Sequence, residues 1–86
     1  MPFLRRYDWV EGQQFLGNMW AIRKGKRAVL CALWTHPFGW ELRLVNDQQV
    51  VRRQVCKQAL EILSVGEAWR AEVEHKDWRP KGSEPS

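Results

Sequence analysis

The side chains of this chain best suited to binding a ligand are cationic and aromatic. They gather between residues 23 and 53: Arg23, Lys24, Lys26, Arg27, Trp34, Arg43, Arg52 and Arg53. Cationic groups hold phosphates, and an indole ring offers a nucleobase a surface on which to stack. The set therefore predicts a site for single-stranded nucleic acid. Two alternatives stay open, namely that the cations keep a hairpin tip soluble and protect its edge, and that Arg43 and Arg52 form ion pairs with Glu41.

A second set of side chains would suit a contact between protein chains. Its members are Met19, Leu30, Trp34, Val45 and Val50. Aromatic residues, Met and Arg are enriched at the centres of protein interfaces. A homodimer, or an inhibitor-type contact with another protein, is therefore the alternative to nucleic acid. Burial of Trp34 beneath Phe3, Tyr7 or Trp9 is a third explanation.

The residues capable of catalysis or metal binding lack the patterns that those functions need. His36 and His75 have no nucleophile nearby in sequence, and the acidic residues are scattered singly. Cys31 and Cys56 form no Cys-x-x-Cys pair and have no His at zinc-ligand spacing, so we expect buried, reduced thiols. The chain also has no glycine-rich phosphate loop. We therefore expect no enzyme activity, no metal and no cofactor.

Length and composition indicate one small globular domain. The 86 residues are 44% hydrophobic and 28% charged, with six tryptophans and a net charge of +4. This composition is too apolar for a disordered chain, and each indole can bury on the order of 200 Å² in a small core. No apolar run reaches the roughly 18–20 residues of a membrane span, and no signal peptide opens the chain. We expect a cytoplasmic location.

Turn signals and a change of period predict the elements of this domain. Short turns at Lys24-Gly25, at residues 36–39 and at Asn46-Asp47 separate four strands, predicted over residues 18–23, 26–35, 40–45 and 48–56. Helical spacing then predicts a helix over 57–78, whose apolar positions are Leu60, Ile62, Leu63, Val65, Trp69 and Val73. Residues 1–17 are expected to form an irregular arm packed on the single domain of residues 18–78, and residues 79–86 a disordered polar tail.

Gly66 leaves two descriptions of this helix open. We favour one continuous helix that crosses closest to the sheet at Gly66. In the alternative, Ser64 and Glu67 form a capping box and the helix breaks into two.

Pairing across the turns sets Thr35 opposite Trp40, Cys31 opposite Leu44 and Trp20 opposite Val29. These pairs sort the strand residues onto two faces. The helix is expected on the face that carries Trp20, Ile22, Val29, Cys31, Leu33, Trp40, Leu42 and Leu44, with Trp69 as its anchor. The other face carries Met19, Ala21, Arg23, Ala28, Leu30, Ala32, Trp34, Glu41, Arg43, Val45, Val50 and Arg52. This second face is too apolar for a solvated surface, so the arm, a second copy or a ligand must close it. A loop at Asn46-Asp47 would pair Glu41 with Arg52, whereas a loop at Asp47-Gln48 would pair Arg43 with Arg52.

The predicted fold is α+β, with a four-stranded antiparallel meander packed on one face by a C-terminal helix (ββββα) and an irregular N-terminal arm. In the order of its elements alone it resembles the Whirly-type single-stranded DNA-binding fold, and shared topology does not confer function. From the residues themselves we expect a small binding module that acts through its basic and aromatic sheet face.

Overall fold

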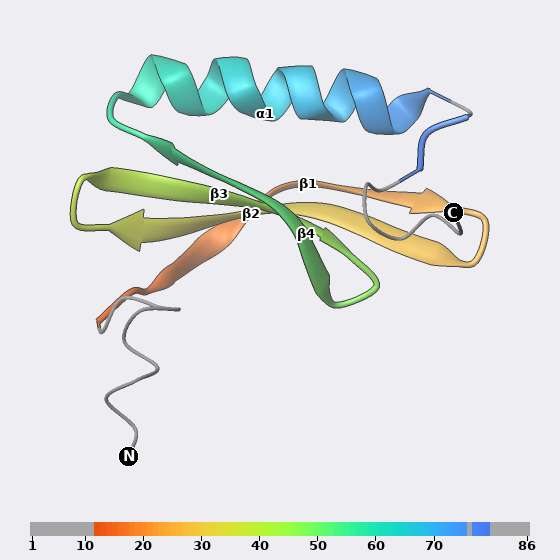
Figure 1. The fold of residues 1–86 in the computed structure, drawn as a ribbon, viewed down its shortest axis with the longest axis horizontal. Coiled ribbons are helices and arrows are strands. Elements are labelled where there is room, and N and C mark those ends of the chain that lie inside the picture. The colour runs from red at the N-terminus through yellow and green to blue at the C-terminus, as the bar shows by residue number, and fades with distance from the viewer. Residues whose placement is uncertain (1–11, 76, 80–86) are drawn as a thin grey trace.

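The fold is a single antiparallel sheet followed by one helix (Figure 1). The computed structural model describes residues 12–75 and 77–79. The strands pair in chain order and are β1 (Phe15–Lys24), β2 (Arg27–His36), β3 (Gly39–Asn46) and β4 (Gln49–Cys56), and the helix is α1 (Ala59–Glu74). The predicted ββββα fold is confirmed, although β1 begins three residues earlier than expected. The predictions for residues 1–11 and 80–86 lie outside the described residues.

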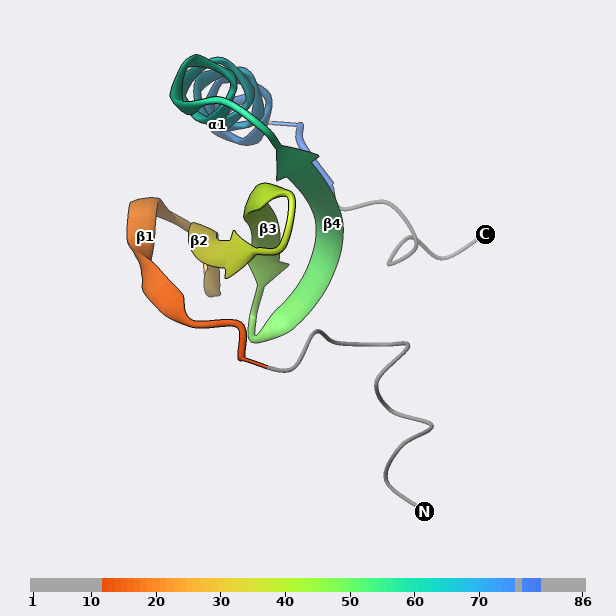
Figure 2. The ribbon, with the colours of Figure 1, turned by 90° about the vertical axis from the view of Figure 1, so that its left-hand side faces the viewer.

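The helix lies along one face of a strongly curved sheet, and the core fills the space between them (Figure 2). The buried residues of this core are Trp20, Val29, Cys31, Leu42, Leu44, Cys56, Ile62, Trp69 and Val73. All of the strand residues that were predicted to face the helix either belong to this core or pack against it. Alternation along the strands therefore predicted the helix-covered face correctly.

Gly66 is the point at which the helix comes closest to the sheet. The indole Nε1 of Trp20 donates a hydrogen bond to the carbonyl oxygen of Gly66 at 2.9 Å. A Cβ atom at residue 66 would lie 2.8 Å from Cε of Met19. The helix runs without a break through this residue, which confirms the continuous helix and excludes the split at Ser64.

The middle hairpin has the predicted register, and the other two differ from prediction. Thr35 pairs with Trp40 and Cys31 with Leu44, as expected. In the first hairpin the loop is Gly25-Lys26 instead of Lys24-Gly25, because Gly25 takes a positive φ of 64° at the first central position. Trp20 therefore lies opposite Cys31 and not opposite Val29.

The last hairpin uses the Asp47-Gln48 loop, the second of the two predicted alternatives. Both loop residues have positive φ angles, 51° and 71°, as tight hairpin turns of this kind require. The register of β3 with β4 shifts by one residue between Leu44 and Val45. Beyond this shift, counted from the turn, Arg43 lies opposite Arg53. Neither predicted pairing of Arg52 occurs.

Bulges in both edge strands explain these register shifts. In β1 the pairing shifts between Asn18 and Trp20, so that Met19 is an extra residue and packs against the core beside Trp20. In β4 the extra residue is Val51, which likewise packs against the core. A bulge lets two consecutive side chains oppose one partner residue and reverses the alternation beyond it. The placement of Met19 and Arg52 on the face opposite the helix was therefore wrong.

The helix is shorter than predicted at both ends, and its two exposed leucines are a further correction. At its start the Glu61 carboxylate accepts a hydrogen bond from the Lys57 backbone N–H at 2.7 Å. The helix ends at Glu74. Beyond it, the Trp78 N–H donates a hydrogen bond to the carbonyl oxygen of His75, and the Trp78 side chain packs on the core. Leu60 and Leu63 were counted on the apolar face, yet they are 74% and 55% exposed.

Replacement of Gly39 by Ala is expected to destabilise the protein by about 2–3 kcal/mol. Gly39 has a φ of 137°, and a Cβ atom there would overlap the backbone carbonyl of Cys56. Gly25→Ala is the matched control, since Gly25 also has a positive φ but has nothing within 4 Å of the added atom. Its cost should be only about 1 kcal/mol. Urea unfolding measures both values, and equal losses would contradict the close approach at Gly39.

Candidate functional site

The sheet face opposite the helix is the candidate site, and we call it the open face. Among the described residues no helix or strand covers it. Strand register places the following side chains on it: Phe15, Asn18, Ala21, Arg23, Ala28, Leu30, Ala32, Trp34, Glu41, Arg43, Val45, Val50, Arg53 and Val55.

Side chains on the open face are arranged in rows that cross the strands. One row is wholly apolar and runs through Ala21, Leu30, Val45 and Val50. The next row consists of Asn18, Ala32, Arg43 and Arg53, and the row beyond it of Phe15, Trp34, Glu41 and Val55. The face therefore joins an apolar band to a region of arginine and aromatic side chains.

A network of charged and polar side chains centres on the Glu41 carboxylate. Nε2 of Gln13 donates to Glu41 Oε1 at 2.8 Å, and Nη2 of Arg43 donates to the same oxygen at 3.2 Å. Arg43 also donates to Oε1 of Gln13 at 3.0 Å. The guanidinium of Arg53 lies 4.0 Å from Glu41 Oε2. The expected ion pair of Glu41 with Arg43 is thus formed, whereas Arg52 pairs with Glu72 and not with Glu41.

These partners set the ionisation of Glu41. Burial by itself raises the pKa of a carboxyl group. Here the hydrogen bonds from Gln13 and Arg43, together with the charges of Arg43 and Arg53, outweigh burial and lower the pKa of Glu41 below its ordinary value. The carboxylate therefore stays charged and keeps Arg43 in place.

Trp34 is part of an aromatic and cationic stack on the open face. The Arg43 guanidinium lies 4.3 Å from the centre of the Trp34 ring. The Phe15 ring lies 5.4 Å from the same ring and is tilted to it by 52°. Trp34 is half-buried, whereas Phe15 is 51% exposed. The exposed aromatic surface at this end of the face therefore belongs mainly to Phe15.

The four cations of the first hairpin divide between the two faces. Lys24 and Arg27 pair with each other on the helix side. Nζ of Lys24 donates to the His75 carbonyl oxygen at 2.6 Å, and the Arg27 guanidinium lies 5.9 Å from the Trp78 ring. Because the last turn of α1 has no basic residue of its own, Lys24 supplies the cation that a helix C-terminus favours.

Arg52 also lies on the helix side. Its guanidinium donates to both carboxylate oxygens of Glu72, at 3.1 and 3.4 Å, and lies 5.4 Å from the ring of Trp69. It therefore covers the edge of the core and does not contribute to the open face.

The structure brings together about half of the predicted site residues. Arg23, Trp34, Arg43 and Arg53 share the open face with the predicted interface residues Leu30, Val45 and Val50. Lys26 lies exposed in the first turn. Lys24, Arg27, Arg52 and Met19 belong to the helix side.

Sequence reasoning missed Gln13 and Phe15 as residues of the site. Both lie in the segment that was predicted to be an irregular arm. The sequence signal that this segment belongs to the sheet was limited to the apolar character of residues 1–17. Two bulges in β1 hide the alternation of polar and apolar residues in that strand.

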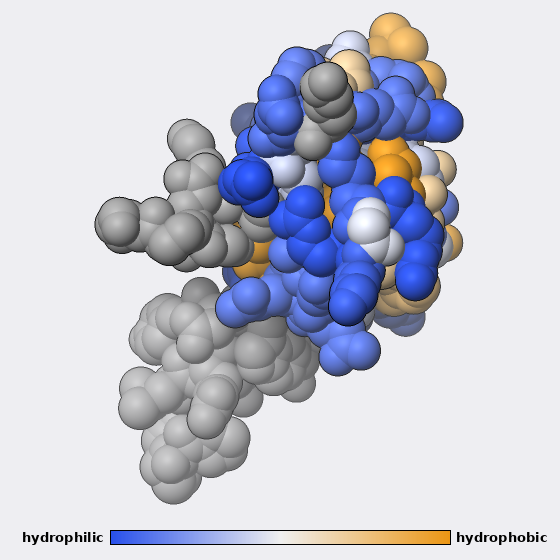
Figure 3. Space-filling model, turned by 90° about the vertical axis from the view of Figure 1, so that its right-hand side faces the viewer, coloured by the Kyte–Doolittle hydropathy of each residue, from blue (hydrophilic) through white to orange (hydrophobic). Residues whose placement is uncertain are grey.

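Charge is divided between the two layers of the molecule. Residues 15–56 carry seven cationic side chains and only two acidic ones, Glu41 and Asp47. Residues 57–75 carry two cationic side chains against Glu61, Glu67, Glu72 and Glu74. Hydrophilic side chains cover most of the end of the molecule where the β1–β2 turn lies (Figure 3). The sheet layer is therefore cationic and the helix layer acidic.

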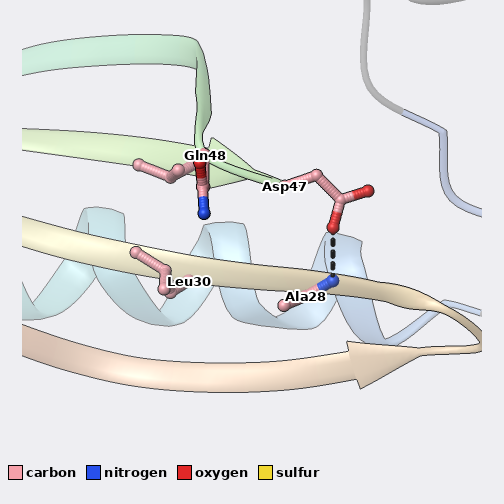
Figure 4. A pocket seen from close by; sticks show the side chains of 5 residues that line it. Ala28, Leu30, Asp47 and Gln48 are labelled. Atoms are coloured by element: carbon pink, nitrogen blue, oxygen red, sulfur yellow. Dashed lines mark hydrogen bonds between the residues drawn. The ribbon is translucent and has the colours of Figure 1, made fainter.

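A shallow hollow of about 380 Å³ lies on the open face, beside the β3–β4 turn. Its lining consists of Ala28, Leu30, Val45, Asp47 and Gln48. The Oδ1 atom of Asp47 accepts a hydrogen bond from the Ala28 N–H at 2.9 Å, which fixes the turn against β2 (Figure 4).

A metal site is not formed by the part of the chain that the structure describes. It contains no group of three or more His, Cys, Asp or Glu side chains that could hold a metal ion. Cys31 and Cys56 are free, buried thiols, as predicted. Burial, with a smaller effect of Cys56, raises the pKa of Cys31 to about 11, so this thiol stays protonated at neutral pH. No helix within the described ranges is long and apolar enough to cross a membrane.

No protein-family model, curated protein or solved structure matches the chain.

Glu41→Gln is expected to lower the free energy of unfolding at pH 7 by about 1–3 kcal/mol, because Arg43 loses its charged partner. A carboxyl group with a lowered pKa stabilises the folded state above its unfolded pKa of about 4.3. That contribution is lost as the pH falls through the folded-state pKa. The difference in stability between the wild type and the variant should therefore shrink as the pH falls from 7 to 3.

Urea unfolding at pH 7 and pH 3 measures this difference. Glu74→Gln removes an exposed carboxylate that pairs with Arg70 and serves as the control. A loss of stability in Glu41→Gln that stays the same at both pH values would contradict the role given to the charge.

Proposed function

We propose that this chain is a small non-enzymatic binding module whose open face binds single-stranded nucleic acid. The observation that carries the proposal is the division of charge: residues 15–56 carry seven cationic side chains, of which Arg23, Arg43 and Arg53 lie on the open face, and the acidic ones lie mainly on the helix. A polyanion would be attracted to the sheet layer and repelled by the helix layer.

The side chains of the open face suit the two parts of a nucleotide. The Arg53 side chain is 55% exposed and Arg23 lies exposed at the other side of the apolar row, so both can reach phosphates. Phe15 offers an exposed ring on which a base can stack. The Arg43 side chain is only 16% exposed. Its guanidinium packs on the Trp34 ring and is proposed to hold that ring in place.

A protein partner, or a second copy of this chain, is the other candidate. The apolar row favours it, because Val50 at the end of this row is 38% exposed. An apolar band with arginines beside it is typical of protein interfaces. Homodimerisation and a cytoplasmic location stay predictions.

Binding of a labelled, mixed-sequence 12-nucleotide single strand, followed by fluorescence anisotropy, tests the first candidate. We expect binding that weakens steeply between 50 and 200 mM salt, as for a ligand held by its phosphates. Arg53→Gln should weaken binding severalfold and reduce the slope of log K against log salt by about 1. Arg70→Gln removes a similarly exposed arginine from the helix layer and should leave binding unchanged. Absence of binding at 50 mM salt, or equal effects of the two variants, would contradict the proposal.

Size-exclusion chromatography with light scattering tests the second candidate. If the apolar row forms a contact between copies, the wild type is a dimer and Leu30→Arg yields monomers, since it places a charge in the middle of that row. Leu63→Arg is the matched control, because Leu63 is 55% exposed on the helix. A wild type that is monomeric at about 100 μM would exclude the homodimer, because its dissociation constant would then be weaker than that of specific dimers.

A further inference from the structure

The hollow beside the β3–β4 turn combines an apolar floor with a polar rim. Ala28 and Leu30 from β2 and Val45 from β3 contribute the apolar surface, and Asp47 and Gln48 lie at the edge. Its volume of about 380 Å³ is at the small end of the roughly 300–1,000 Å³ of small-ligand pockets. It therefore suits one planar ring system better than an extended ligand.

The backbone of the turn fixes how the two rim residues are presented. The Ala28 N–H donates to Oδ1 of Asp47, and the Asp47 N–H donates to the Ala28 carbonyl oxygen, both at 2.9 Å. One carboxylate oxygen is therefore used within the protein, while the other points away from Ala28 (Figure 4). Gln48 is exposed and adds a carboxamide that can both donate and accept.

Cations flank the hollow along the strands. Arg23 lies opposite Ala28, and the row of Arg43 and Arg53 lies two residues beyond the row of Leu30 and Val45. Four residues of a strand span about 13 Å, so a ring in the hollow has arginines on both sides within reach of its neighbouring phosphates.

We infer that this hollow binds one base of a single-stranded nucleic acid and prefers adenine or cytosine to thymine. This inference rests on the proposed function. The Asp47 carboxylate accepts a hydrogen bond from an exocyclic amino group, which adenine and cytosine carry. The Gln48 carboxamide donates to the adjacent ring nitrogen. Thymine carries the O4 carbonyl oxygen where adenine and cytosine carry the amino group, and this oxygen repels a carboxylate.

Two 12-nucleotide single strands, one made only of deoxycytidine (dC12) and one only of thymidine (dT12), test this inference when their binding is compared at the same salt concentration. The two pyrimidines are similar in size. The wild type is expected to bind dC12 at least fivefold more tightly than dT12. Asp47→Asn should abolish or invert that preference, because its carbonyl oxygen can still accept from Ala28 while its NH₂ group replaces an acceptor by a donor. Asn also tolerates the positive φ of 51° at this position.

Asp77→Asn provides the control, since it makes the same change of charge outside the open face and should keep the wild-type preference. Equal affinity of the wild type for dC12 and dT12, or an unchanged preference in Asp47→Asn, would overturn the inference while the proposed function stands. Failure of both oligonucleotides to bind at 50 mM salt would overturn the two together.

Discussion

The contact of Trp20 with Gly66 is the constraint on which the rest of this structure depends. Because residue 66 has no side chain, the helix backbone comes close enough for its carbonyl oxygen to accept a hydrogen bond from the Trp20 indole at 2.9 Å. Trp69 and Val73 are then buried against the same side of the sheet. Because the helix lies on this face, no helix or strand within residues 12–75 and 77–79 covers the opposite face.

The edge-strand bulges determine which side chains reach that opposite face. In β1 the extra residue brings Met19 into the core, and in β4 the extra residue does the same for Val51. Both bulges improve the packing of the helix-covered face, and both change the composition of the open face. Arg53 is placed beside Arg43 and Glu41, whereas Arg52 turns toward Glu72 on the helix. The candidate site is thus partly a consequence of how the core is filled.

Turn residues and strand alternation predicted the fold and most of the open face. The Pro37-Phe38 turn was read correctly because Pro and Gly occupy its characteristic positions, and the register of β2 with β3 followed from it. Arg52 and Met19 were misplaced because no residue type marks a bulge, and one extra residue reverses every later side chain. The roles of Lys24 and Arg27 could not be predicted, since their partners His75 and Trp78 are about 50 residues away in sequence.

Nuclear magnetic resonance of the backbone amides during titration with a mixed-sequence single-stranded 12-mer tests the central claim most directly. We expect the signals of Leu30, Val45 and Arg53 to shift in proportion to the bound fraction, while those of Leu63 and Glu67 on the outer side of the helix do not. Shifts confined to the helix, or no shifts at a low salt concentration, would contradict the claim that the sheet face opposite the helix is the binding surface.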